Sequence, residues 1–223
     1  MTKICQNPEL KVYEIRESCS QIDIFQNVHQ SLDIRLQEGI AFTYAVFLDN
    51  SELSLTIATE KKSDLQTHSQ IKGQIFAFIP AKSASTSSLK VNAVLQASGA
   101  EVKVYLIAIQ EEQAELSLQG EINISENVEK VSGHLLEEVV LLWNASYTSL
   151  QPILNVASPD VQASHGAKVH RISPEKLFYM QSKGLDMNAA TGMMIDAYLQ
   201  QVLGNFELSD EQKAIIYSFV HKK

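Results

Sequence analysis

The sequence predicts a mainly β protein with a helical C-terminal region, and two patterns in its 223 residues support this. From Ser31 to about Arg171, short runs alternate apolar and polar residues, as half-buried strands do. Pairs that tolerate positive φ, such as Asp49-Asn50, separate these runs. After Arg171 the alternation is replaced by helix caps and by apolar residues spaced three and four apart.

The elements before the helices follow from these runs in order. Residues up to Gln30 are weakly patterned, and we expect one short strand or helix there. Strands are then expected at residues 40–48, 53–58, 74–79, 89–95, 101–109, 114–121 and 139–145. Turns are expected at residues 38–39, 49–50, 98–99 and 119–120, and the serine-rich tract 83–88 is expected to be a loop.

Three helices are expected after these strands. Ser173-Pro174 places a hydroxyl at the N-cap and a proline at the first helical position, and Gly184 suits a left-handed C-terminal cap. A second helix begins at Asp186 and carries one apolar face. The capping box from Ser209 to Gln212 predicts the start of the third.

Short strands without intervening helices leave three architectures open: a sandwich, a closed barrel or a solenoid. Periodicity does not separate them. The chain contains 23 Ser and 18 Gln, spread along its length. Neutral polar side chains can stack on the outer face of a solenoid without bringing like charges together, so composition favours the solenoid modestly.

The composition and the cysteine content also limit which binding partners and which cell compartment we expect for the chain. The net charge is -8, and no long run of Lys or Arg occurs, so nucleic acid is an unfavourable partner. A membrane-spanning helix needs about 18 consecutive apolar residues, and no segment of the sequence approaches that length. The N-terminus also lacks a secretory signal, so we expect a cytoplasmic protein that does not enter membranes. Cys5 and Cys19 have no partners at metal-ligand spacing.

Common enzyme signatures are absent from the sequence. No phosphate-binding loop, dinucleotide fingerprint, zinc-protease motif or nucleophile elbow occurs. The carboxylate pairs Glu111-Glu112 and Glu137-Glu138 are not interpreted as a general acid and base, since neighbours on a strand face opposite ways. We interpret both as surface pairs, which are usually solvated. The absence of these signatures removes the common nucleotide, zinc-protease and hydrolase interpretations, but it does not by itself exclude an enzyme.

The stretch from residue 151 to residue 185 carries an ordered series of motifs: P-x-L-x-V, D-V-x-x-S-H-G-A, a Val, a basic residue and Ile, and then L-F-Y-M-x-S-K-G. These motifs comprise Pro152, Leu154, Val156, Asp160, Val161, Ser164, His165, Gly166, Ala167, Val169, Arg171, Ile172, Leu177, Phe178, Tyr179, Met180, Ser182, Lys183 and Gly184. In this order they resemble the C-terminal part of the SufB/SufD family, the scaffold subunits of an iron-sulfur cluster assembly machine.

The resemblance covers roughly residues 32–203 and implies a fold. That fold is a right-handed parallel β-helix, a solenoid, followed by a C-terminal α-helical domain. The implied domains are an N-terminal cap segment at residues 1–30, a β-helix core at residues 31–172 and a helical domain at residues 173–223. Family members are usually much longer at the N-terminus, so we expect a shortened member.

The resemblance also implies a site residue. His165 followed by Gly166 is similar to the SufD type, whereas SufB-type chains carry a Glu after this histidine. His165 is therefore a candidate iron ligand or cluster-assembly group, and a neutral imidazole suits both roles. The alternative is that its ring only satisfies backbone groups. The remaining histidines, including His170, are interpreted as surface or turn residues.

The family further implies partners. Leu177, Phe178, Tyr179 and Met180 are candidates for docking the SufC-type ABC ATPase, and a SufB-type scaffold subunit is expected to pair with the chain. The alternative state of the isolated chain is a homodimer. A transient iron-sulfur cluster is expected only in the complex, with none held tightly by the chain alone.

Two other functions stay open at this point. A shortened member can keep a structural or regulatory role and build no cluster. A β-helix protein acting on polysaccharide is the other alternative, although Trp143 is the only tryptophan.

Overall fold

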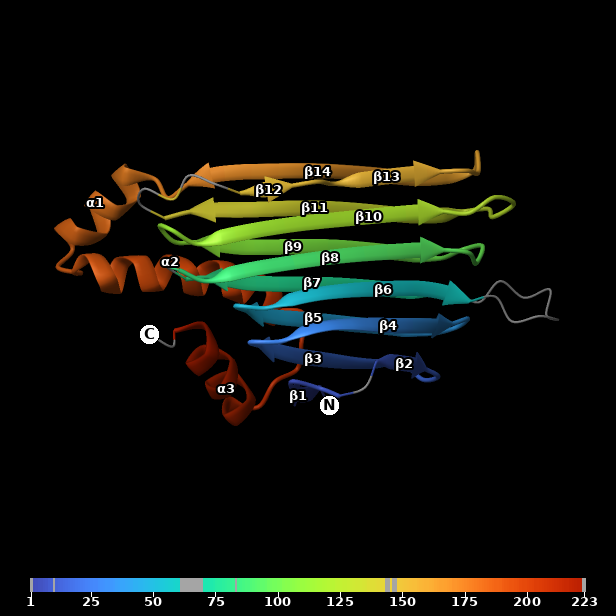
Figure 1. The fold of residues 1–223 in the computed structure, drawn as a ribbon, viewed down its shortest axis with the longest axis horizontal. Coiled ribbons are helices and arrows are strands. Elements are labelled where there is room, and N and C mark those ends of the chain that lie inside the picture. Colours follow the sequence, from blue (N-terminus) through green and yellow to red (C-terminus); the bar gives the residue numbers. More distant parts are fainter. Residues whose placement is uncertain are drawn as a thin grey trace.

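The computed structural model describes residues 2–9, 11–60, 70–82, 84–142, 145 and 148–221. Within these residues the chain forms two sheets and three C-terminal helices (Figure 1). Trp143 lies outside the described residues.

Every strand pair in the two sheets is parallel. The sheet that we call the covered sheet consists, in spatial order, of β1 (Lys3–Gln6), β3 (Cys19–Gln26), β5 (Ala41–Asp49), β7 (Lys72–Ala81), β9 (Glu101–Gln110), β11 (Val131–Leu141) and β14 (Val161–Arg171). The sheet that we call the open sheet consists of β2 (Val12–Ile15), β4 (His29–Gln37), β6 (Glu52–Glu60), β8 (Thr86–Leu95) and β10 (Glu115–Ile124), with β12 (Ser149–Leu150) and β13 (Ile153–Val156) both pairing with β10.

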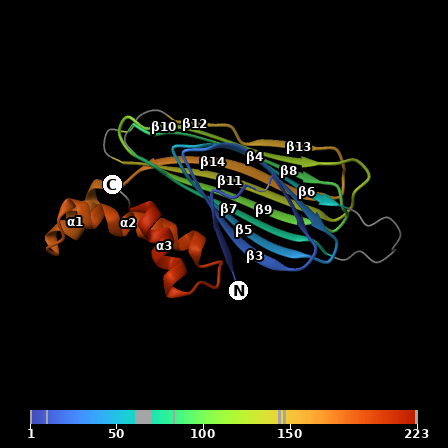
Figure 2. The same cartoon turned by 60° about the horizontal axis from the view of Figure 1, so that its bottom comes forward.

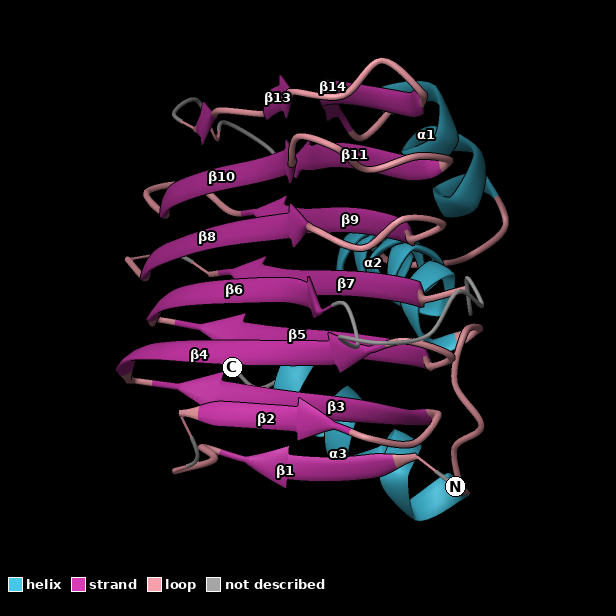
Figure 3. Cartoon of the chain, turned by 90° about the vertical axis from the view of Figure 1, so that its right-hand side faces the viewer, coloured by secondary structure: helices cyan, strands magenta, loops and turns pink. Residues whose placement is uncertain are grey.

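The chain alternates between the two sheets until β12 and β13, so strands two apart along it pair with one another (Figure 3). The side chains that face inward from both sheets form one apolar core, to which Leu55, Val91 and Leu118 belong. The open sheet alternates buried and less buried residues along each strand, as a sheet with one solvated face does.

The covered sheet is buried on its second face by helices. Helices α2 (Met187–Leu203) and α3 (Asp210–Val220) lie on this side, and α1 (Pro174–Ser182) lies beyond the end of the sheets (Figure 2). Leu199 and Phe219 pack with Phe47 and Phe78 of the sheet in a second apolar cluster. Burial on both faces explains why strands such as β5 are apolar nearly throughout.

The predicted helix caps are confirmed. The side chain of Ser173 accepts a hydrogen bond from the backbone N–H of Lys176, and Asp186 caps α2 in the same way. Both hydrogen bonds of the capping box at Ser209 are present. Gly184 adopts a φ of 92°, the left-handed conformation predicted after α1.

The mainly β region is confirmed, but four local predictions were wrong. Before Gln30 the chain forms β1, β2 and β3 and begins β4, because each pairs with the next strand of its sheet. Residues 119–120 lie inside β10 rather than in a turn, and the tract 83–88 enters β8 at Thr86. The strand expected at 139–145 begins at Val131 and ends at Leu141.

Among the described residues, no helix has the length and apolarity to cross a membrane.

Candidate functional site

Strand β14 forms the last edge of the covered sheet. It pairs with β11 on one side, and no described strand pairs with its other side. The Ile172 N–H donates to Leu141 O at 3.3 Å, so the N–H and C=O groups of the even-numbered residues of β14 face β11. The N–H and C=O groups of odd-numbered residues, His165 and Ala167 among them, therefore face outward along an open edge.

His165 lies at the middle of this edge and is exposed. It pairs in register with Leu135, whose side chain is buried in the apolar core, so both side chains lie on the inward side of the sheet. Nδ1 of His165 lies 3.0 Å from the Pro152 carbonyl oxygen. A carbonyl oxygen only accepts, so Nδ1 carries the hydrogen and Nε2 of the neutral ring keeps a free lone pair. That lone pair can bind iron.

The bond to the Pro152 carbonyl is also what we would expect if the ring of His165 served only to satisfy backbone groups. One ring nitrogen can bond the carbonyl while the other acts as a ligand, so the two interpretations are compatible. Among the described residues, no three His, Cys, Asp or Glu side chains gather as a metal site. The described residues therefore do not by themselves supply three such ligands for a metal at His165.

The pair Glu137-Glu138 was wrongly interpreted as solvated. Glu137 is 0% exposed and Glu138 is 7% exposed. Neighbouring strand residues do face opposite ways, but here both faces of the covered sheet are buried, the inner by the core and the outer by the helices. Nothing in the local sequence indicates that second layer, which comes from residues more than forty positions away.

Glu138 belongs to a polar cluster that joins β14 to α2. Lys168 Nζ lies 2.7 Å from Glu138 Oε1, and His170 Nε2 lies 3.6 Å from the same oxygen. The Tyr198 hydroxyl on α2 lies 2.8 Å from His170 Nε2. Burial, followed by the nearby Lys168 charge, lowers the pKa of His170. His170 is thus a half-buried junction residue rather than the surface or turn residue that the sequence predicts.

Glu137 faces the interior of the molecule. Its Oε1 accepts a hydrogen bond from the backbone N–H of Gly120, on the opposite sheet, at 2.6 Å. Burial raises the pKa of Glu137 to about 7, although hydrogen bonds from the backbone of Gly120 and Gln151 oppose this. An ionisable group with a pKa near neutrality therefore lies in the core below β14.

This pKa predicts that Glu137 contributes less stability as the pH rises. Between its ordinary pKa of 4.5 and its folded value of about 7, the folded chain retains a proton that the unfolded chain has released. The free energy of unfolding therefore falls as the pH rises through this window. Glu137→Gln cannot ionise, so we expect the variant to gain roughly 3 kcal/mol relative to wild type from about pH 4.5 to above about pH 7. Denaturant unfolding across this range measures the difference, and a flat difference would contradict the prediction.

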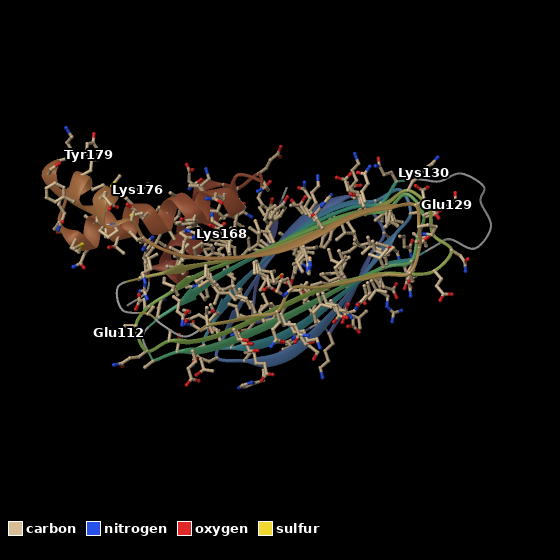
Figure 4. All side chains as sticks on the ribbon, turned by 90° about the horizontal axis from the view of Figure 1, so that it is seen from above. Glu112, Glu129, Lys130, Lys168, Lys176 and Tyr179 are labelled. Atoms are coloured by element: carbon tan, nitrogen blue, oxygen red, sulfur yellow. The ribbon has the colours of Figure 1, made fainter. Side chains whose placement is uncertain are left out.

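Helix α1 presents aromatic side chains away from the sheets. Phe178 is 73% exposed and Tyr179 is 62% exposed. Figure 4 shows Tyr179 and Lys176 on α1, beyond the end of the sheets. Leu177 is buried and lines a cavity of about 320 Å³. Of the four predicted docking residues, two are therefore available to a partner, Leu177 packs inward and Met180 is half-buried.

Comparison with known proteins identifies one family and several relatives. Residues 53–198 match the family model described as SUF system FeS cluster assembly, SufBD core domain. The iron-sulfur cluster assembly protein SufD of Escherichia coli (strain K12) is 31% identical over 83 residues, which are 37% of this chain and 20% of that protein. SufD of Bacillus subtilis (strain 168) is 26% identical over 100 residues, 45% of this chain and 23% of that protein.

SufB of the same Bacillus strain is 22% identical over 93 residues, 42% of this chain and 20% of that protein. The matches thus span a quarter or less of the length of these curated relatives. The range matched by the family model includes His165, Phe178 and Tyr179.

Proposed function

This chain belongs to the SufBD core-domain family of iron-sulfur cluster assembly proteins, and on that premise we propose that it is a SufD-like scaffold subunit acting in the cytoplasm. In this role it pairs with a SufB-type subunit, docks a SufC-type ABC ATPase and is not itself an enzyme. The observation that carries the proposal is the position of His165 on an open strand edge, with one ring nitrogen held and the other free.

As part of this proposal, the two parallel sheets form successive coils of a right-handed parallel β-helix, and the strand pairing supports this. From β1 to β12, each strand pairs in parallel with the strand two positions along the chain, and the inner faces of the two sheets form a continuous core. Such a stack grows coil by coil and leaves a strand edge at its end. The last coil, with β12, β13 and β14, provides this edge.

Two features of that end suit a scaffold partner. The outward backbone groups of β14 can pair with a strand of another chain. Around them, the inward-side residues Val156 and Val169 are each 47% exposed, and a partner coil would bury them. A SufB-type subunit seated here would bring its own side chains to His165, and these could complete the ligands of a nascent cluster. A second copy of this chain is the alternative occupant.

The proposed function is tested by substituting His165 and measuring cluster assembly. We combine the chain with a SufB-type and a SufC-type protein and follow anaerobic iron-sulfur reconstitution by absorbance. We expect His165→Ala to lower the cluster yield by about tenfold or more, because a ligand is lost. His134→Ala is the matched control, since among the described residues the side chain of His134 bonds Ser132 and Ser164.

The outcomes separate the candidates. No association of the chain with either partner would contradict the scaffold function. Association with unchanged assembly in His165→Ala would favour the shortened member that docks partners without building a cluster.

A further inference from the structure

The charges of the chain are unevenly distributed along its sequence. The segment from residue 161 to residue 185 contains four cations and one carboxylate, namely Lys168, Arg171, Glu175, Lys176 and Lys183. With histidine counted as neutral, this segment has a net charge of +3, although the whole chain has a net charge of -8. The other residues therefore have a net charge of -11. A cationic region thus lies on a chain that is otherwise strongly acidic.

Two of these cations form a stripe with an aromatic ring on α1. Lys176, Tyr179 and Lys183 follow one another at intervals of three and four residues, so they lie on one face of the helix, and we call them the cationic stripe. All three side chains are exposed, and Figure 4 shows Lys176 and Tyr179 beyond the end of the sheets. Lys183 Nζ lies 5.4 Å from the centroid of the Tyr179 ring, so the ammonium group and the ring are presented to solvent together.

Among the residues that the structure describes, the lysines of the cationic stripe have no counter-charge. None of the ion pairs between these residues includes Lys176 or Lys183. The carboxylate of the same helix, Glu175, lies in its first turn and accepts a hydrogen bond from the Ser173 hydroxyl at 2.6 Å. The stripe is therefore a site of unbalanced positive charge, which attracts anionic groups.

The spacing of the two charges favours an acidic protein surface over other anions. Seven residues of helix place Lys176 and Lys183 about 10 Å apart along the axis, with the Tyr179 ring between them. A single phosphate group is too small to contact both ammonium groups across that ring. A nucleic acid or an anionic membrane is large enough, but the net charge of -11 on the other residues would repel it. A protein surface can place separate carboxylates opposite the two lysines and apolar atoms opposite the ring.

The exposed aromatic residues of α1 supply the apolar part of this contact. Phe178 and Tyr179 are 73% and 62% exposed, and a partner that covers them would also exclude water around the neighbouring lysines. We infer that the SufC-type ATPase docks on α1 through an acidic face, whose carboxylates pair with Lys176 and Lys183 around an aromatic centre. The identity of this partner rests on the function proposed above, whereas its acidic character rests on the charges of the stripe.

The salt dependence of ATPase binding tests for the acidic face. We measure the association rate of the chain with a purified SufC-type ATPase between about 50 mM and about 0.5 M NaCl. Opposite charges steer association most strongly at low salt, so the wild-type rate should fall steeply as the salt concentration rises. Lys176→Gln combined with Lys183→Gln should associate roughly tenfold more slowly than wild type at about 50 mM NaCl and equally fast at about 0.5 M.

Lys11→Gln combined with Lys90→Gln is the matched control. Both lysines are exposed, and neither belongs to an ion pair among the described residues. The control loses the same two charges, so it should keep the wild-type rate and its salt dependence. Lys176→Glu combined with Lys183→Glu reverses the charges of the stripe and should slow association by roughly a hundredfold at about 50 mM NaCl.

Equal association rates for wild type and the glutamine variant of the stripe at about 50 mM NaCl would overturn the inference. An equal loss in the Lys11→Gln, Lys90→Gln control would overturn it too, because the effect would then reflect net charge alone. Weaker self-association of the stripe variant, with unchanged ATPase binding, would overturn it in favour of a second copy as the occupant. In each of these cases the ATPase still binds, whereas no binding by wild type would contradict the proposed function itself.

Discussion

Phe178→Ala combined with Tyr179→Ala is expected to abolish capture of a SufC-type ATPase while leaving the fold of the chain almost unchanged. Both side chains project from α1 into solvent, with 73% and 62% of their surface exposed. Removing them therefore leaves no cavity in the core, and surface substitutions of this kind change stability little.

The expected loss of binding is large because exposed aromatic residues are frequent hot spots of protein interfaces. A hot-spot aromatic contributes about 2 kcal/mol or more, so the double variant should weaken the Kd by roughly a hundredfold or more. Tyr179 is also pre-positioned, since Lys183 Nζ lies 5.4 Å from its ring centroid. Calorimetry or pull-down with the purified ATPase measures the change.

Ile215→Ala is the matched control for this prediction. Ile215 is a 38% exposed apolar residue on α3, so its loss removes apolar surface from another helix. Wild-type affinity in this variant and lost affinity in the double variant would locate docking on α1. Undiminished binding by the double variant, with a thermal unfolding curve like that of wild type, would contradict the prediction.

The sequence predicted elements whose signals are local and missed those stabilised by distant residues. The caps at Ser173 and Ser209 were correct because the bonded groups lie three residues apart. Strand β3 was missed because Asp23 interrupts its apolar pattern. That carboxylate is 0% exposed and is bonded by the hydroxyl of Tyr44, 21 residues away, at 2.7 Å.

The candidate site divides in the same way. His165 could be found from its motif, but its bond to the Pro152 carbonyl depends on a break in strand pairing that no motif shows. Gly120 resembled a turn glycine, whereas it is required because Leu135 and Glu137 approach its backbone across the core. Tertiary contacts of this kind override the local preference of a glycine for turns.

Ala167→Pro is expected to abolish pairing with a SufB-type subunit without unfolding the chain. Ala167 is an exposed odd-numbered residue of β14, so its N–H faces the open edge and takes no part in the ladder with β11. A proline there removes no hydrogen bond of the folded chain, as edge positions of a sheet allow. Its ring replaces the outward N–H, which a pairing strand of the partner would need.

Ala167→Ser separates the backbone effect from a change of side chain. Serine keeps the N–H and adds one polar atom at an exposed position, so we expect it to pair as wild type does. Size-exclusion chromatography with light scattering, on mixtures with the SufB-type subunit and on the chain alone, measures both heterodimer and homodimer. Heterodimer formation by a folded Ala167→Pro variant would contradict pairing through β14. Loss of the homodimer alone would show that the open edge serves a second copy of this chain. The neighbours of His165 would then be residues of that second copy rather than those of a different subunit.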